Sequence, residues 1–150
     1  MIKSPLRYPG GKSRAIDIIT SITPGFDEFR EPFVGGGSVY INLKQTFPSR
    51  KFWINDLYYP LYIFWKMSQT KLDEVIEQVW KWKDVYKTGK ELYRYLLDNI
   101  ESFNEVERAS AFFVFNRITF SGTSESGGYS EGSFKGRFTD SSIDRLSKLS

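Results

Sequence analysis

The chain has 150 residues, of which 40% are hydrophobic and 17% aromatic, so it can bury a core and is not a disordered segment. It contains no cysteine and no histidine, which excludes disulfides, thiolate chemistry and a histidine general base. The net charge of +3 is compatible with a polyanionic partner without being specific to one. We expect no metal site, no membrane-spanning segment, no signal peptide and a cytoplasmic location.

The chain opens with a structured turn over residues 5–12, which hold two prolines and two glycines. Four basic residues precede the first acidic residue of the chain: Lys3, Arg7, Lys12 and Arg14. This concentrated positive charge can meet phosphates or a carboxylate. An amphipathic helix is predicted to start at Ser13 and to end at Thr23-Pro24-Gly25.

Residues 26–34 are predicted to form a strand that runs directly into three glycines. Ser38 is the predicted N-cap of a helix that reaches about Phe47. A second short strand over residues 51–54 ends at Asn55-Asp56 and is followed by another helix. This order predicts a βαβ unit with parallel strands, an architecture typical of nucleotide-binding proteins.

The strongest functional signal is the turn Glu31-Pro32-Phe33-Val34-Gly35-Gly36-Gly37-Ser38. Glycines at a strand-to-helix turn let the backbone approach a ligand, although the spacing departs from the dinucleotide-binding fingerprint. Asp56 follows the next strand, about 20 residues on, where a carboxylate typically holds ribose hydroxyls. Both features also have a purely structural reading, in which Asp56 caps a helix beginning at Leu57.

Gly11-Lys12-Ser13 is similar to the end of a phosphate-binding loop. Leu6 occupies the position of that loop's first glycine, however, and no strand is predicted before it. We therefore rank nucleotide triphosphate hydrolysis below the other hypotheses, and an ordinary basic turn is the alternative.

Two or three helices are predicted over residues 71–120. Residues 121–138 are rich in glycine and serine and are predicted to form a β-hairpin with Gly127-Gly128 at its tip. Residues 141–150 are predicted to form a further helix.

The motifs Pro5-Leu6-Arg7-Tyr8-Pro9-Gly10-Gly11-Lys12, Glu31 to Ser38 and Asn55-Asp56, in this order, resemble those of the Dam-type adenine-specific DNA methyltransferases. The resemblance spans essentially the whole chain. It implies an α/β, Rossmann-like S-adenosylmethionine-dependent methyltransferase fold with an incomplete sheet and a helical plus β-hairpin DNA-recognition insertion. The cofactor-binding residues that it implies are Tyr8, Lys12, Phe33, Gly35, Gly37 and Asp56. Lys12 would contact the carboxylate of the cofactor and Asp56 its ribose.

The resemblance also implies double-stranded DNA as a partner, because Asn116-Arg117 to Gly122 matches the family's Asn-Arg-containing helix end. The DNA-binding residues that it implies are Arg7, Arg117, Ser121, Lys135 and Arg137. By the same resemblance, residues 1–67 form the cofactor-binding part and residues 68–140 the target-recognition insertion. Residues 141–150 would begin the return to the catalytic domain.

The family binds the target adenine with an Asp-Pro-Pro-Tyr segment. No two of the six prolines in this chain are adjacent, so the segment is absent and the chain holds no catalytic residue. In the family's order it would follow residue 150, or a second chain would carry it. We predict the cofactor-binding and DNA-recognition part of an adenine methyltransferase, inactive alone. The alternatives are a non-catalytic DNA-binding module and one half of a split methyltransferase.

Overall fold

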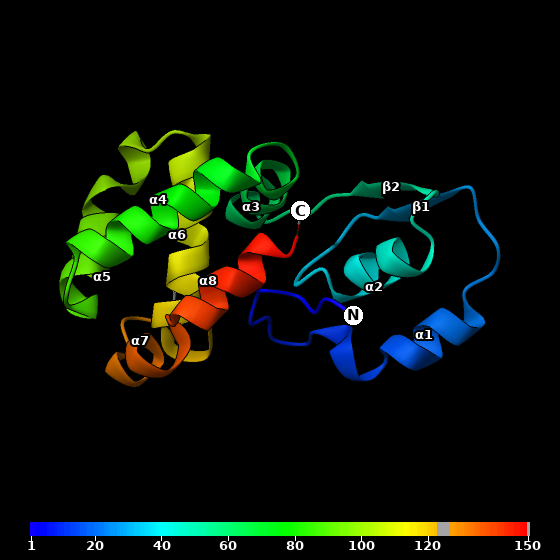
Figure 1. The fold of residues 1–150 in the computed structure, drawn as a ribbon, viewed down its shortest axis with the longest axis horizontal. Coiled ribbons are helices and arrows are strands. Elements are labelled where there is room, and N and C mark those ends of the chain that lie inside the picture. Colours follow the sequence, from blue (N-terminus) through cyan, green and yellow to red (C-terminus); the bar gives the residue numbers. More distant parts are fainter. Residues whose placement is uncertain (123–126, 150) are drawn as a thin grey trace.

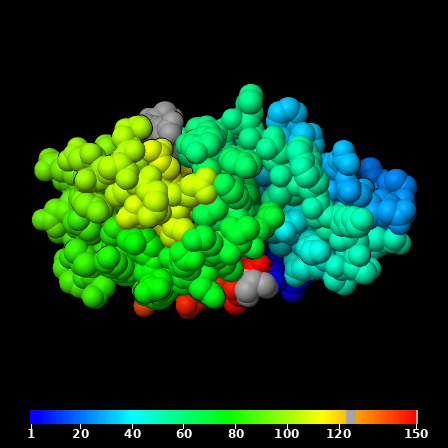
Figure 2. All heavy atoms as spheres, turned by 90° about the horizontal axis from the view of Figure 1, so that it is seen from above, coloured from blue at the N-terminus to red at the C-terminus, as the bar shows by residue number. Residues whose placement is uncertain are grey.

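The computed structural model describes residues 1–122 and 127–149, and these form two parts that lie side by side (Figure 1). A small α/β part holds the N-terminal third of the chain, and a larger part is mainly helical. Figure 2, viewed from above, shows the same division, with the α/β part (cyan to blue) at one end and the helical part (green to yellow) at the other. Among the described residues, no helix combines the length and the apolar composition that crossing a membrane requires.

The α/β part contains the predicted βαβ unit. Strands β1 (Glu28–Glu31) and β2 (Lys51–Ile54) pair in parallel, with Glu28 opposite Lys51. Helix α2 (Ser38–Thr46) connects them and buries its apolar face. The carboxyl ends of both strands lie at one edge of the sheet, and the glycine turn and Asp56 therefore lie beside each other.

Three boundaries in this part differ from the sequence predictions. The N-terminal helix does not start at Ser13: a 3₁₀ turn over Lys12–Arg14 precedes helix α1 (Ile16–Ile22), which no side chain caps. The first strand covers only four of the nine residues predicted. Gly37, and not Ser38, occupies the N-cap position of α2, because the chain turns into the helix through a left-handed residue with φ of 71°.

The helical part is built around one buried helix. Within the described residues its α-helices are α3 (Tyr59–Thr70), α4 (Leu72–Val85), α5 (Gly89–Asn99), α6 (Glu105–Ile118), α7 (Glu131–Arg137) and α8 (Asp140–Ser147). Residues 109–118 of α6 are all buried, and helices α3, α4, α5 and α7 pack around it. Asn104 and Glu107 form a capping box at its start. The predicted helices between residues 71 and 120 are confirmed.

The β-hairpin predicted over residues 121–138 is wrong in its second half. Thr119 and Tyr129 form a single antiparallel bridge, and the chain then enters α7. Ser130 caps this helix by accepting a hydrogen bond from the Ser133 N–H (3.2 Å). This local cap competes with strand pairing. The glycine-rich composition indicated a hairpin and gave no sign of the helix. The predicted hairpin also included residues 123–126, which lie outside the described part.

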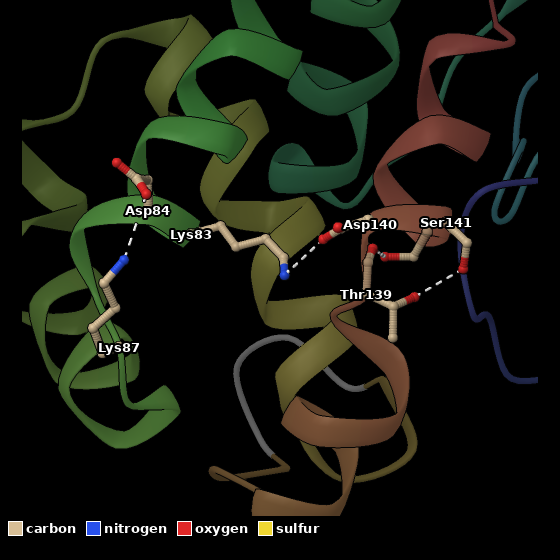
Figure 3. A network of polar contacts seen from close by, with 7 residues as sticks. Lys83, Asp84, Lys87, Thr139, Asp140 and Ser141 are labelled. Carbon is tan, nitrogen blue, oxygen red and sulfur yellow. Dashed lines mark hydrogen bonds and ion pairs between the residues drawn. The ribbon is translucent and has the colours of Figure 1, made fainter.

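Helix α8 packs against α4, and a polar contact joins the two helices (Figure 3). Asp140 at its first turn pairs with Lys83 of α4 at 3.0 Å. The ammonium group of the same lysine lies 5.5 Å from the centroid of the Phe138 ring. Buried Ile143 and Leu146 supply the apolar face of this helix, which confirms the helix predicted for the tail.

A single side chain ties the N-terminal segment to the helical part. Asn116 is 1% exposed, and its amide nitrogen donates to the carbonyl oxygens of Arg7 (2.7 Å) and Gly122 (3.1 Å). Its amide oxygen accepts from the Arg7 N–H (2.9 Å). Asn116 therefore fixes residue 7, which is remote in sequence, against the end of α6 and the turn at Gly122.

We expect Asn116→Ala to lower the free energy of unfolding by about 3 kcal/mol, because it leaves buried backbone groups without partners. Urea denaturation measures this loss. The control is Asn99→Ala, which removes one hydrogen bond to a carbonyl of its own helix and is expected to cost less than about 1 kcal/mol. Equal losses in the two variants would contradict the role assigned to Asn116.

Candidate functional site

A cavity of about 240 Å³ lies between the N-terminal segment, the glycine turn and the end of β2. Its lining includes all six residues that the sequence analysis selected for the cofactor: Tyr8, Lys12, Phe33, Gly35, Gly37 and Asp56. These residues come from three separate segments, and the parallel pairing of β1 and β2 brings two of the segments to one edge. The three motifs therefore share one cavity.

Asp56 holds two loops at this edge. One carboxylate oxygen accepts from the Gly35 N–H (2.9 Å), and the other accepts from the Tyr58 N–H (3.0 Å). The second contact is close to the capping role considered for Asp56, although α3 begins at Tyr59. A carboxylate has about four lone-pair sites, so Asp56 retains the capacity to accept from ligand hydroxyls.

The glycine turn is shaped by two aromatic side chains of the protein itself. A Cβ atom at Gly36 would lie 2.8 Å from the Cβ of Tyr8, and one at Gly37 would lie 2.4 Å from the Trp65 ring. Trp65 also donates from its indole nitrogen to the Gly35 carbonyl (2.9 Å). The glycines thus serve internal packing as well as lining the cavity.

Glu31 is a cavity residue that the sequence analysis quoted within its motif but gave no role. One of its carboxylate oxygens, Oε2, is buried and has no hydrogen-bond partner. Burial raises the pKa of Glu31 to about 7, against the attraction of Lys12 and a backbone hydrogen bond from Tyr40, which both lower it. The signal available in the sequence was an acidic residue at the last position of the strand, directly before the glycine turn.

The rim of the cavity combines aromatic and basic side chains. Phe33 is 70% exposed, and Lys12 lies in the exposed 3₁₀ turn. Burial, and then the charge of Asp56, raise the pKa of Tyr8, so its phenol stays neutral and can donate a hydrogen bond. The cavity therefore presents one cation, two carboxyl groups and two aromatic rings to a ligand.

The residues selected for DNA fall into two groups. Arg117 is 5% exposed, with its guanidinium 5.3 Å from the Phe113 ring centroid. Burial lowers its pKa, and the charges of Arg145, Arg7 and Arg137 lower it further. Lys135, in contrast, pairs with Glu131 on its own helix at 3.1 Å.

Ser121 lies in the segment that leaves α6. It has a φ of 54°, a left-handed conformation that is uncommon outside glycine. Phe120 before it is 58% exposed. This strained turn presents an aromatic ring and a hydroxyl next to the arginines at the end of α6.

We expect Gly37→Ala to destabilise the fold by about 3 kcal/mol, from a positive φ and from overlap with Trp65. Gly10→Ala is the matched control, because Gly10 also has a φ of 72° but has nothing within 4 Å of an added Cβ. This control is expected to cost about 1 kcal/mol. Thermal unfolding compares the two, and equal losses would show that the Trp65 contact is unimportant.

The raised pKa of Glu31 makes stability depend on pH. The folded state holds this proton more tightly than the unfolded state, so the contribution of Glu31 to stability falls as pH rises from about 4.5 to about 7. Glu31→Gln removes this dependence, and its melting temperature relative to the wild type should rise over the same range. Glu28→Gln, which changes an exposed carboxylate on the same strand, is the control. Parallel pH profiles for wild type and Glu31→Gln would contradict the assignment.

Comparison with known proteins places this chain in a family. Residues 8–149 match the D12 class N6 adenine-specific DNA methyltransferases. The type II methyltransferase M.MjaIII of Methanocaldococcus jannaschii is 27% identical over 136 aligned residues, which cover 81% of this chain and 47% of that protein. The DNA adenine methylase of Vibrio cholerae is 30% identical over 121 residues, which cover 78% of this chain and 41% of that protein.

A third relative, the DNA N-6-adenine-methyltransferase of Escherichia phage P1, is 29% identical over 122 residues and is covered to 16% of its length. The chain thus spans less than half the length of these three relatives. The family match, in contrast, extends over nearly all of the chain. On this ground the chain belongs to the D12 class of N6 adenine-specific DNA methyltransferases.

Proposed function

We propose that this chain is the cofactor-binding and DNA-recognition part of an enzyme that methylates the exocyclic amine of adenine in DNA, with S-adenosylmethionine as methyl donor. The observation that carries the proposal is the single cavity that gathers residues of three motifs in a chain of this family. The names of the relatives support this reaction, and the cavity supports the proposal that this part binds the methyl donor.

The charges around the cavity fit S-adenosylmethionine, which carries a carboxylate, an ammonium group, a sulfonium and a ribose. Lys12 is the cation available to the carboxylate, and Asp56 can accept from the ribose hydroxyls. Glu31 Oε2, buried and without a partner, needs a donor, and an ammonium group provides one. When bound, S-adenosylmethionine supplies an electrophilic methyl group, and the residues named above hold it in the cavity.

The DNA-recognition role rests on Arg7, Arg117, Ser121 and Arg137, which lie near the exit of α6 and around the N-terminal segment. Arg7 and Tyr8 are adjacent in sequence, so the arginines adjoin the cofactor cavity. We propose a smaller role for Lys135, because Glu131 already neutralises it.

The chain contains no Asp-Pro-Pro-Tyr segment. We therefore assign the binding of the adenine amine to residues outside these 150, on another segment or a second chain, and we expect no methyl transfer by this chain alone. Methyl transfer by the isolated chain would contradict that assignment.

Calorimetric titration with S-adenosylmethionine tests the proposal. We expect the wild-type chain to bind and Lys12→Gln to bind about tenfold more weakly, because a charge-assisted contact is lost. Arg14→Gln is the control, since Arg14 lies in the same 3₁₀ turn and outside the cavity lining.

Equal affinities for S-adenosylmethionine in these two variants would show that Lys12 does not contact the cofactor. If the wild-type chain released no heat with S-adenosylmethionine and still bound DNA, the result would favour a non-catalytic DNA-binding module of the same fold.

A further inference from the structure

Four arginines from distant parts of the sequence converge where the N-terminal segment, α6, α7 and α8 meet. We name Arg7, Arg117, Arg137 and Arg145 the arginine cluster. Asn116 fixes the backbone of residue 7 against the end of α6, and α7 packs on α6. The charges of Arg145, Arg7 and Arg137 all act on Arg117, with Arg145 the strongest of the three.

Among residues 1–122 and 127–149, no carboxylate pairs with the arginine cluster. In the part of the chain that the structure describes, none of its four members forms an ion pair. The first acidic residues of α7 and α8 pair elsewhere, Glu131 with Lys135 and Asp140 with Lys83. No described carboxylate therefore compensates the positive charge of the cluster.

Two members of the cluster have buried donors without acceptors. Arg117 is 5% exposed, and its Nε atom is buried with no hydrogen-bond partner; Nη1 of Arg7 is in the same condition. Burial, and then the neighbouring arginines, lower the pKa of Arg117 to about 10, which still leaves it charged at neutral pH. Buried cations among like charges are unfavourable unless an anion joins them.

Arg137 and Arg145 lie on the exposed side of the same cluster. An anion that reaches them from solvent can also approach the donors of the two more deeply placed arginines. Guanidinium groups bind phosphate oxygens through paired, charge-assisted hydrogen bonds, and several of them can share one phosphate.

We propose that the arginine cluster binds a backbone phosphate of DNA, and that Arg145, which no motif selected, is one of its contacts. This inference rests on the proposed function. A backbone phosphate fits better than a base edge, because the cluster offers converging charge without acceptors, and direct readout of bases also uses acceptors.

Fluorescence anisotropy of the chain with two short duplexes of unrelated sequence, at several salt concentrations, tests the inference. Loss of one phosphate contact weakens binding equally for both sequences and reduces the slope of log affinity against log salt by about 1. We expect this result for Arg145→Gln, with affinity about tenfold lower at moderate salt. Arg145→Lys should retain the slope, because it keeps the charge.

Arg94→Gln is the matched control, since it removes an exposed arginine on α5 that does not act on Arg117. Circular dichroism verifies that each variant folds. If Arg145→Gln does not fold, Arg137→Gln is used in its place. Arg137→Gln should give the same loss of slope.

An unchanged salt slope in the cluster variant, or equal effects in Arg94→Gln, would overturn this inference alone and would indicate that a carboxylate from another protein segment compensates the cluster. Failure of the wild-type chain to bind either duplex would overturn the proposed DNA-recognition role together with the inference.

Discussion

The hydrogen bond from the Gly35 N–H to the Asp56 carboxylate is the contact on which the α/β part depends. It joins the turn after β1 to the turn after β2, and the second oxygen of the same carboxylate holds the entry to α3. Only two paired strands are present among the described residues, so the ladder alone leaves the sheet edge weakly determined. Asp56 adds a further constraint beside the backbone hydrogen bonds of Asn55 with Glu31 and Val34, and these contacts together hold the walls of the cavity.

Local patterns in the sequence were sufficient to predict the βαβ unit and the long helices. A glycine turn after a strand and the apolar periodicity of α2 and α4 are properties of neighbouring residues. The six cavity residues lie in motifs that can be identified in chain order. The boundaries were less accurate because they depend on single caps. Gly37 displaced Ser38 from the N-cap, and Ser130 began a helix where the composition indicated a hairpin.

Long-range features were not accessible from the sequence. The roles of Glu31 and Arg145 depend on what surrounds them in space, a buried oxygen without a donor in one case and three nearby guanidinium groups in the other. No spacing rule connects residue 145 with residue 7, since Asn116 and the packing of α8 bring their segments together. Whether a cation is buried without a hydrogen-bond partner also depends on the fold, and the amino-acid composition contains no information about it.

Asn116 binds both the amide and the carbonyl of residue 7, as a neighbouring strand would. Such a pair of hydrogen bonds fixes the register of the segment as well as its position, because successive side chains of an extended chain point to opposite sides. Arg7 consequently joins the arginines while Tyr8 covers the glycine turn. Deletion of one residue before position 7 would leave the composition almost unchanged, but it could shift the segment by one residue against Asn116. After such a shift an aromatic ring would face the arginines and a cation would face the glycine turn. This length constraint explains how a short N-terminal segment can serve two surfaces at once.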